Sequence, residues 1–267
     1  MLNQKRPASD LLTRRVHYDL PGMDAVGVRR DVAYTTPANA ELTMDVYSPP
    51  DRTASERTPA VVLVPGFPGA VKRIGSFVSW AELMAASGLV AITCSTKEPV
   101  PDMEAVLVYV REYAASLGVD GERMGLWACS GHVPNALSIL AGPERRFLKC
   151  AALCYGFMLD LDGSTAVADA SRQYGFANPC SNRTFEDLPR DRPLFLARAG
   201  RDESPGLNAA LDAFLAAALR DNRPVTFVNH AAGPHAFDVM DDSAATRDVV
   251  RQVLAFLKSQ LSNADSP

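Results

Sequence analysis

Three residues, far apart in the sequence, have side chains suited to nucleophilic catalysis: Ser130, Asp202 and His235. Each lies just after an apolar run that is typical of a buried β-strand. A serine becomes a strong nucleophile when a histidine accepts its proton and a carboxylate orients that histidine. Because the carboxyl ends of parallel strands meet at one edge of a sheet, the sequence predicts that these three side chains share a catalytic site.

The nucleophile is expected at a tight turn between a strand and a helix, where two adjacent residues could serve. A turn of this kind is crowded and tolerates only small neighbours two residues from its apex. Ser130 has the small Ala128 at that distance, whereas Cys129 would have the bulky Trp127. We therefore predict Ser130 as the nucleophile.

The acid and the base each have alternatives. Asp202 lies between Ser130 and His235 in sequence order, but Glu203 is adjacent and Asp160 also follows a strand-like run. The four histidines are at positions 17, 132, 230 and 235, and His235 is the one in a loop between a predicted strand and the last helix. His230 is expected at the end of that strand, from which it is less able to reach the serine.

Backbone N–H groups are predicted to complete the site. Gly131 begins the helix after Ser130, and the N–H groups at a helix N-terminus favour a developing negative charge. The partner of Gly131 is expected in the turn at 65–68, where we predict Phe67 because Pro68 has no N–H to donate. We expect Tyr155 and Phe157, which follow another strand end, to line the substrate pocket.

The elements that must position these residues alternate along the chain. Strands are predicted at 26–35, 41–47, 60–64, 89–93, 124–128, 150–155, 193–199 and 225–229, and helices at 80–87, 102–117, 131–141, 206–220 and 246–261. This alternation predicts an α/β fold with a mostly parallel central sheet flanked by helices. The first two strands, joined by a turn at 36–39, are expected as an antiparallel pair at one edge.

The chain is expected to form one domain over residues 25–262. Residues 1–24 are polar and irregular and are predicted to be a loosely attached N-terminal arm, with a short tail at 263–267. The polar stretch 161–192 interrupts the alternation and is expected to be a small lid or loop excursion without helical periodicity.

Composition excludes several classes of function. The formal net charge of −4 gives no basic surplus for binding nucleic acid. No apolar run approaches the roughly 18 residues of a membrane span, and there is no signal-peptide pattern. Five cysteines without such a signal are typical of reduced thiols in a cytoplasmic protein, and Cys150 and Cys154 are expected to pack as small apolar groups on one strand face.

Patterns for cofactors and metals are absent from the sequence. It has no Gly-x-Gly-x-x-Gly after a strand, no phosphate-binding Gly-x-x-x-x-Gly-Lys, no His-Glu-x-x-His and no Cys-x-x-Cys. His230, His235 and Asp238 could be imagined around a metal, but nothing in the sequence orients them. We therefore expect no cofactor and no metal.

Four motifs together resemble the α/β-hydrolase superfamily, and more narrowly its dienelactone-hydrolase-like and small carboxylesterase members. They are Val-Leu-Val-Pro-Gly-Phe-Pro-Gly at 62–69, Trp-Ala-Cys-Ser-Gly-His at 127–132, Ala-Gly-Arg-Asp-Glu-Ser at 199–204 and Gly-Pro-His-Ala-Phe-Asp at 233–238. The resemblance covers roughly residues 55–261 and includes the chain order Ser, Asp, His. The usual Gly-x-Ser-x-Gly is altered, because Ala128 and His132 replace its outer glycines.

The resemblance implies a serine hydrolase that cleaves carboxylic esters through an acyl-enzyme. The nucleophile of dienelactone hydrolases proper is a cysteine, so Ser130 favours general ester hydrolysis. Lactone, amide or peptide hydrolysis by the same residues is an alternative, as is a binding protein with slow turnover. The expected partner is a small-molecule ester, with short or compact acyl groups preferred, and the sequence leaves a homo-oligomer open.

Overall fold

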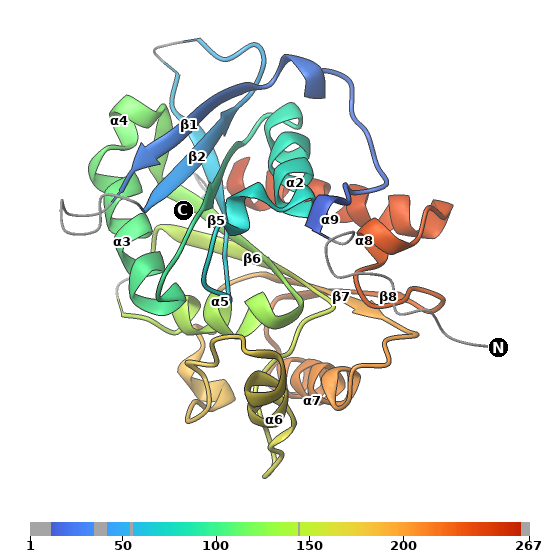
Figure 1. The fold of residues 1–267 in the computed structure, drawn as a ribbon. Helices are drawn as coiled ribbons and strands as arrows, with labels where there is room; N and C mark the ends of the chain where they lie inside the picture. Colours follow the sequence, from blue (N-terminus) through green and yellow to red (C-terminus); the bar gives the residue numbers. More distant parts are fainter. Residues whose placement is uncertain (1–11, 35–41, 54–55, 144, 263–267) are drawn as a thin grey trace.

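The computed structural model describes residues 12–34, 42–53, 56–143 and 145–262. The expected turn at 36–39, the tail at 263–267 and the first part of the arm lie outside these ranges. Within them, one eight-stranded sheet runs through the molecule, with helices on both of its faces (Figure 1).

The strands lie in the order β1-β2-β4-β3-β5-β6-β7-β8. Their bounds are β1 Gly27–Ala33, β2 Thr43–Ser48, β3 Thr58–Leu63, β4 Val90–Cys94, β5 Val119–Cys129, β6 Leu148–Cys154, β7 Leu194–Ala199 and β8 Val225–His230. Strands β3 to β8 pair with one another in parallel, whereas β2 is antiparallel to both β1 and β4. The prediction of a mostly parallel sheet with an antiparallel pair at one edge is confirmed.

The longer helices divide between the two faces of the sheet. Apolar side chains of α2 (Gly75–Ala86) and α9 (Ala244–Ser262) pack with one buried cluster. Those of α3 (Pro99–Glu112), α5 (Val133–Leu140) and α7 (Leu207–Arg220) pack with the other. The central strand β5 shows why both clusters form, because Leu126 and Ala128 face one while Trp127 and Cys129 face the other.

Several boundaries differ from the sequence predictions. The helix expected at 102–117 begins earlier, at Pro99, and is divided at Tyr113 into α3 and the short α4 (Ala114–Leu117). Strand β5 begins at Val119, five residues before the predicted start. These differences lie at element ends and do not change the topology.

The polar stretch 161–192 contains a helix that the sequence analysis did not predict. Helix α6 (Ala166–Tyr174) packs Val167 and Ala170 against α7 in a small third apolar cluster. The expectation that this stretch lacks helical periodicity was therefore wrong. Two buried positions three residues apart are enough for a short helix that leans on a neighbour.

The part of the N-terminal arm that the structure describes is held against the domain. Val16 is buried, and its N–H donates to Ser79 Oγ on α2 at 3.0 Å. The N–H of His17 donates to the carbonyl of Asp238 at 2.8 Å. Residues 12–24 are thus more firmly attached than their polar sequence indicates, because buried hydrogen bonds and one apolar anchor fix them.

Candidate active site

The nucleophile candidate lies at a strained turn after the central strand. Ser130 follows β5 directly and begins the 3-10 helix η4 (Ser130–His132), which continues into α5. Its φ of 51° is in the left-handed region that residues with side chains rarely adopt. Such a turn projects the side chain above the end of the sheet, away from the strand and helix that hold it.

The structure brings Ser130, His235 and Asp202 into one hydrogen-bonded chain. Ser130 Oγ is 2.8 Å from His235 Nε2, and His235 Nδ1 is 2.6 Å from Asp202 Oδ2. The Asp202 side chain is fully buried, while that of His235 is 35% exposed. The histidine can therefore contact both a buried carboxylate and a substrate.

Two loops are tied together so that Asp202 and His235 meet. Strands β7 and β8 are parallel neighbours, and beyond their ends the N–H of Gly200 donates to the carbonyl of His230. The N–H of Arg201 donates to the carbonyl of Gly233, and both of these hydrogen bonds are 2.9 Å long. The sheet pairing thus continues into both loops and fixes their separation.

The charge of Asp202 is stabilised by its hydrogen bonds. Burial opposes ionisation, but bonds from His235 and from the N–H of Ser204 outweigh it, so the pKa of the carboxyl lies below its usual value. A buried carboxylate in this state favours a positive charge on the adjacent imidazole.

Two of the alternative residues, Asp160 and His230, are engaged elsewhere. The Asp160 carboxylate accepts the N–H groups of Val167 and Ala168 at the start of α6, at 2.8 and 2.9 Å. His230 Nε2 lies 3.0 Å from Asp241 Oδ2 and 2.9 Å from Thr246 Oγ1, away from the serine. Both residues have structural roles.

Cys129 is a poor nucleophile in this environment. Its side chain is buried, and burial together with the charge of Asp238 raises the pKa of the thiol well above its usual value. Cys150 and Cys154 lie with it in the same apolar cluster, on the face of β6 predicted from their spacing. All five cysteines are free and buried.

The turn at 65–68 is fixed by hydrogen bonds on three successive carbonyls. Asn135 Nδ2 donates to the carbonyl of Pro65 at 2.7 Å, the N–H of Ala177 donates to that of Gly66 at 2.7 Å, and Thr96 Oγ1 donates to that of Phe67 at 3.0 Å. The N–H of Phe67 itself has no acceptor among the described residues. Its role as an oxyanion donor therefore stays a prediction.

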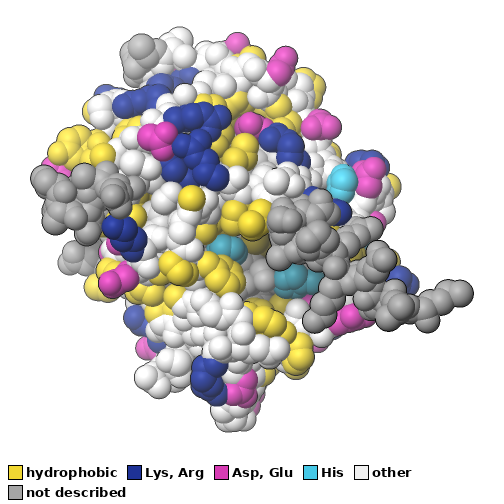
Figure 2. All heavy atoms as spheres, viewed as in Figure 1, with side chains coloured by type: hydrophobic (Ala, Val, Ile, Leu, Met, Phe, Trp, Pro, Cys, Tyr) yellow, Lys and Arg dark blue, Asp and Glu magenta, His cyan; other side chains and the backbone are white. Residues whose placement is uncertain are grey.

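A cavity of about 690 Å³ opens above the serine. Its walls are mostly apolar and include Phe67, Phe77 and Tyr155, with Ser130 and His235 at the polar end. Figure 2 shows this face of the molecule, where hydrophobic and histidine side chains surround a hollow. The volume is typical of a small-molecule site.

Of the two pocket residues predicted from sequence, only Tyr155 lines this cavity. Phe157 is buried in the third cluster, where its ring stacks on Phe176 with centroids 5.1 Å apart. The expectation for Phe157 was therefore wrong. Tyr155 has a φ of 37°, so the chain turns sharply after β6 and the next side chains leave the cavity.

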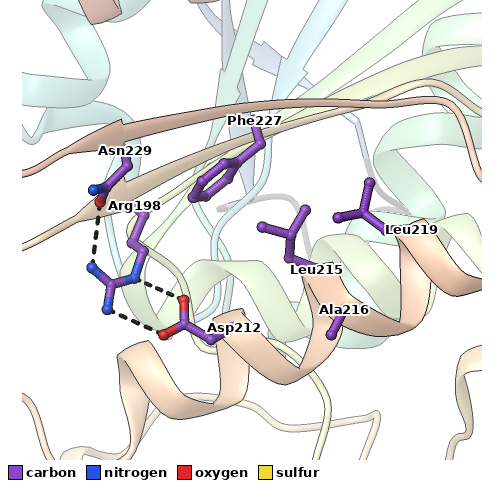
Figure 3. Close-up of a pocket in the computed structure, with 7 residues that line it drawn as sticks. All are labelled: Arg198, Asp212, Leu215, Ala216, Leu219, Phe227 and Asn229. Carbon is purple, nitrogen blue, oxygen red and sulfur yellow. Dashed lines mark hydrogen bonds and ion pairs between the residues drawn. The ribbon is translucent and has the colours of Figure 1, made fainter.

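A second concavity lies beside the last strand of the sheet, between β8 and α7 (Figure 3). In this concavity Arg198 and Asp212 form a bidentate ion pair, with N–O distances of 2.8 and 3.1 Å, beside the apolar Leu215 and Phe227. Its charges are paired with each other and it holds no nucleophile. This concavity therefore lacks the residues for the nucleophilic chemistry expected above Ser130.

The described residues contain no group of three or more His, Cys, Asp or Glu side chains that could hold a metal ion. None of the helices in the same ranges combines the length and the apolar character needed to cross a bilayer.

Comparisons with known proteins give matches in structure alone. No family model and no curated protein sequence matches the chain. Esterase 2 from the planctomycete Thermogutta terrifontis has a TM-score of 0.68 at 19% identity, over 92% of this chain and 97% of that one. The same esterase phosphonylated by sarin has a TM-score of 0.66 at 17% identity, over 92% and 97%.

A bacterial heroin esterase is also similar, with a TM-score of 0.70 at 15% identity over 92% of this chain and 87% of that one. At these identities the likeness concerns the fold. Together with the strand order and the turn at Ser130, it shows that this chain has the α/β-hydrolase fold.

Proposed function

We propose that the protein is a serine hydrolase that cleaves carboxylic esters through an acyl-enzyme. The observation that carries this proposal is the hydrogen-bonded chain from Ser130 Oγ through His235 to the buried Asp202. It lies at the end of an apolar cavity, on a fold shared with solved esterases.

In the first half of the reaction, Ser130 Oγ attacks the acyl carbon while His235 Nε2 takes its proton. The N–H groups of Phe67 and Gly131 hold the negative charge that develops on the carbonyl oxygen. His235 then gives the proton to the leaving alcohol, and Asp202 stabilises the transient imidazolium.

In the second half, water replaces the alcohol. His235 removes a proton from the water, which attacks the acyl carbon. His235 then returns a proton to Ser130 Oγ as its bond to the acyl carbon breaks, which releases the acid and restores the enzyme. Every proton transfer uses the same imidazole, so the reaction requires no cofactor.

The proposed substrates are esters with short or compact acyl groups. The aromatic rings of Phe67, Phe77 and Tyr155 border the cavity near the serine. The Thermogutta esterase was solved with propionate bound and with butyrate bound, which supports a short acyl group in a site of this fold. We also propose a cytoplasmic location, which the five free, buried thiols support.

Burst kinetics with p-nitrophenyl acetate test the proposed function. The wild type should release about one equivalent of nitrophenol per site in a rapid phase before steady turnover, as an accumulating acyl-enzyme requires. Ser130→Ala should show neither the burst nor turnover above background while remaining folded. Undiminished turnover by Ser130→Ala would contradict the proposal.

A further inference from the structure

His132 occupies the position two residues after the nucleophile, where glycine is usual in this fold. Its ring is buried between Phe67 and Phe77, with centroids 5.1 and 5.0 Å away and both contacts edge-on. Its Nδ1 accepts the N–H of Gly66 at 2.7 Å. The imidazole therefore joins the serine turn to the turn that presents Phe67.

A glycine on the facing turn makes room for this histidine. A Cβ on Gly66 would lie 2.7 Å from His132 Cα and 2.3 Å from the carbonyl oxygen of Gly131. No side chain fits at position 66, so the close approach depends on Gly66. This close backbone approach brings the N–H of Gly66 within hydrogen-bond distance of His132 Nδ1.

The hydrogen bond from Gly66 fixes the tautomer of His132. Nδ1 accepts a hydrogen bond, so it carries no proton. Burial lowers the pKa of the ring to about 3, which keeps it neutral in ordinary buffers. A neutral imidazole without a proton on Nδ1 must carry it on Nε2.

The Nε2–H group is available to a ligand in the cavity. Nε2 has no hydrogen-bond partner among the described residues. It is also absent from their polar atoms that are fully buried without a partner, so it is not completely enclosed. His132 lines the cavity above Ser130, so this atom opens onto it. A hydrogen bond from an otherwise unpaired N–H group among apolar walls to an acceptor on the ligand stabilises the complex.

The ester-hydrolysis scheme leaves this donor unused. Ser130 and His235 bond to each other, and the hydroxyl of Tyr155 donates to Asp238 at 2.7 Å behind the cavity wall. The oxyanion is held by backbone groups. The polar atom of His132 is thus left to contact a part of the substrate other than the reacting carbonyl.

We propose that His132 determines specificity, with its Nε2–H donating to an acceptor oxygen that the substrate carries close to its ester group. The preferred substrates are then esters with an ether, keto or hydroxyl oxygen beside the reacting carbonyl, rather than their hydrocarbon equivalents. This inference rests on the proposed ester hydrolysis and assigns a substrate class to the same site.

Matched pairs of esters test the inference. In one pair the oxygen is in the acyl group, p-nitrophenyl methoxyacetate against p-nitrophenyl butyrate. In the other it is in the alcohol, 2-methoxyethyl butyrate against butyl butyrate turned over under the same conditions. The ratio of kcat/KM within a pair is compared between wild type and His132→Asn, which cancels intrinsic differences in reactivity.

The asparagine variant separates the two ring nitrogens. Its side-chain oxygen can replace Nδ1 as the acceptor for Gly66, but it has no group at the place of Nε2. In one of the two pairs, the variant should lower the oxygen-to-hydrocarbon ratio about fivefold or more. The affected pair identifies the part of the substrate that His132 contacts.

A second measurement does not depend on turnover. Nitrogen-15 NMR of the histidine rings in Ser130→Ala should show His132 protonated on Nε2 alone. Adding the oxygen-bearing fragment of the affected pair, methoxyacetate or 2-methoxyethanol, should shift that signal more than adding its hydrocarbon equivalent, butyrate or 1-butanol. Unchanged ratios in both pairs, or a proton on Nδ1, would overturn the inference while ester hydrolysis stands. A wild type that turns over none of the esters would overturn the proposed function and this inference with it.

Discussion

The segments that follow β6 and β7 leave the same edge of the sheet, and each carries an aspartate with a different use. After β6, Asp160 accepts two backbone N–H groups of α6, which lie seven and eight residues later in the chain. After β7, Asp202 binds the imidazole of His235, 33 residues away. The role of each carboxylate depends on the donors that the local fold brings to it.

The two segments also differ in length and in their contact with the cavity. The β6 segment is long and includes α6, but none of its residues from 161 to 192, all of them described, lines the cavity. The β7 segment is a short turn that is bonded to the neighbouring loop at Gly200 and Arg201. The short β7 segment positions Asp202, whereas the long β6 segment contributes only packing, with Phe176 against Gly131.

Replacing the carboxylate after β7 should have the largest effect. Asp202→Asn should lower kcat by roughly 10³- to 10⁴-fold, because the amide cannot stabilise the imidazolium and favours the wrong tautomer of His235. Steady-state kinetics with p-nitrophenyl acetate measure the loss. A reduction of less than tenfold would place the orienting acid elsewhere.

The acyl-chain preference should show the next largest effect. The polar excursion adds no lining, so the apolar walls open to an acyl chain are those of the cavity above Ser130. Each methylene that extends beyond this cavity gains little of the roughly 0.8 kcal/mol that burial provides. Among p-nitrophenyl esters from acetate to palmitate, kcat/KM should peak at butyrate or shorter. A maximum at decanoate or longer would contradict the short-chain proposal and leave the roles of Ser130 and His235 untouched.

The same chemical change after β6 should affect stability instead of catalysis. Asp160→Asn retains one acceptor oxygen for α6 and loses the other, so the free energy of unfolding should fall by about 1 kcal/mol. Urea unfolding measures this loss, and kcat should stay within about twofold of wild type. If kcat fell as far as in Asp202→Asn, the two segments would not have the separate uses described above.

The smallest effect concerns stability against pH. The folded-state pKa of Asp202 lies below its unfolded value, so its ionised contacts stabilise the fold above the unfolded pKa and are lost as the pH falls through the folded one. The difference in unfolding free energy between wild type and Asp202→Asn should therefore shrink below about pH 4. Denaturant unfolding between pH 3 and 7 measures it, and a difference that grows on acidification would be inconsistent with a stabilised carboxylate.

The strong, regular signals in the sequence predicted most of the fold. Continuous apolar runs such as that of β3, and the long apolar stripe of α9, specify their elements locally. Helix α6 was missed because its support is not local. Its first N–H groups are held by Asp160, which precedes the helix by six residues, and its apolar side chains pack on α7.

In the site, too, regular sequence signals were predictive and non-local contacts were not. Ser130, Asp202 and His235 each follow a predicted strand, and parallel strands bring their carboxyl ends together, so the sequence predicted that these residues meet. The sequence could not predict that Phe157 faces away, because the turn at Tyr155 ends the alternation of the strand. Nor could it assign His132 a partner, because Gly66 lies 66 residues earlier and only the fold brings the two together.

Covalent labelling tests the central claim most directly. A fluorophosphonate reacts with a serine that an adjacent base activates, so the wild type should gain one adduct, mapped by peptide mass spectrometry to Ser130. Cys129→Ala should be labelled as the wild type is, because its thiol is buried and protonated. Labelling of Ser130→Ala at the wild-type rate, or an adduct that maps to another residue, would contradict the assignment of Ser130 as the nucleophile.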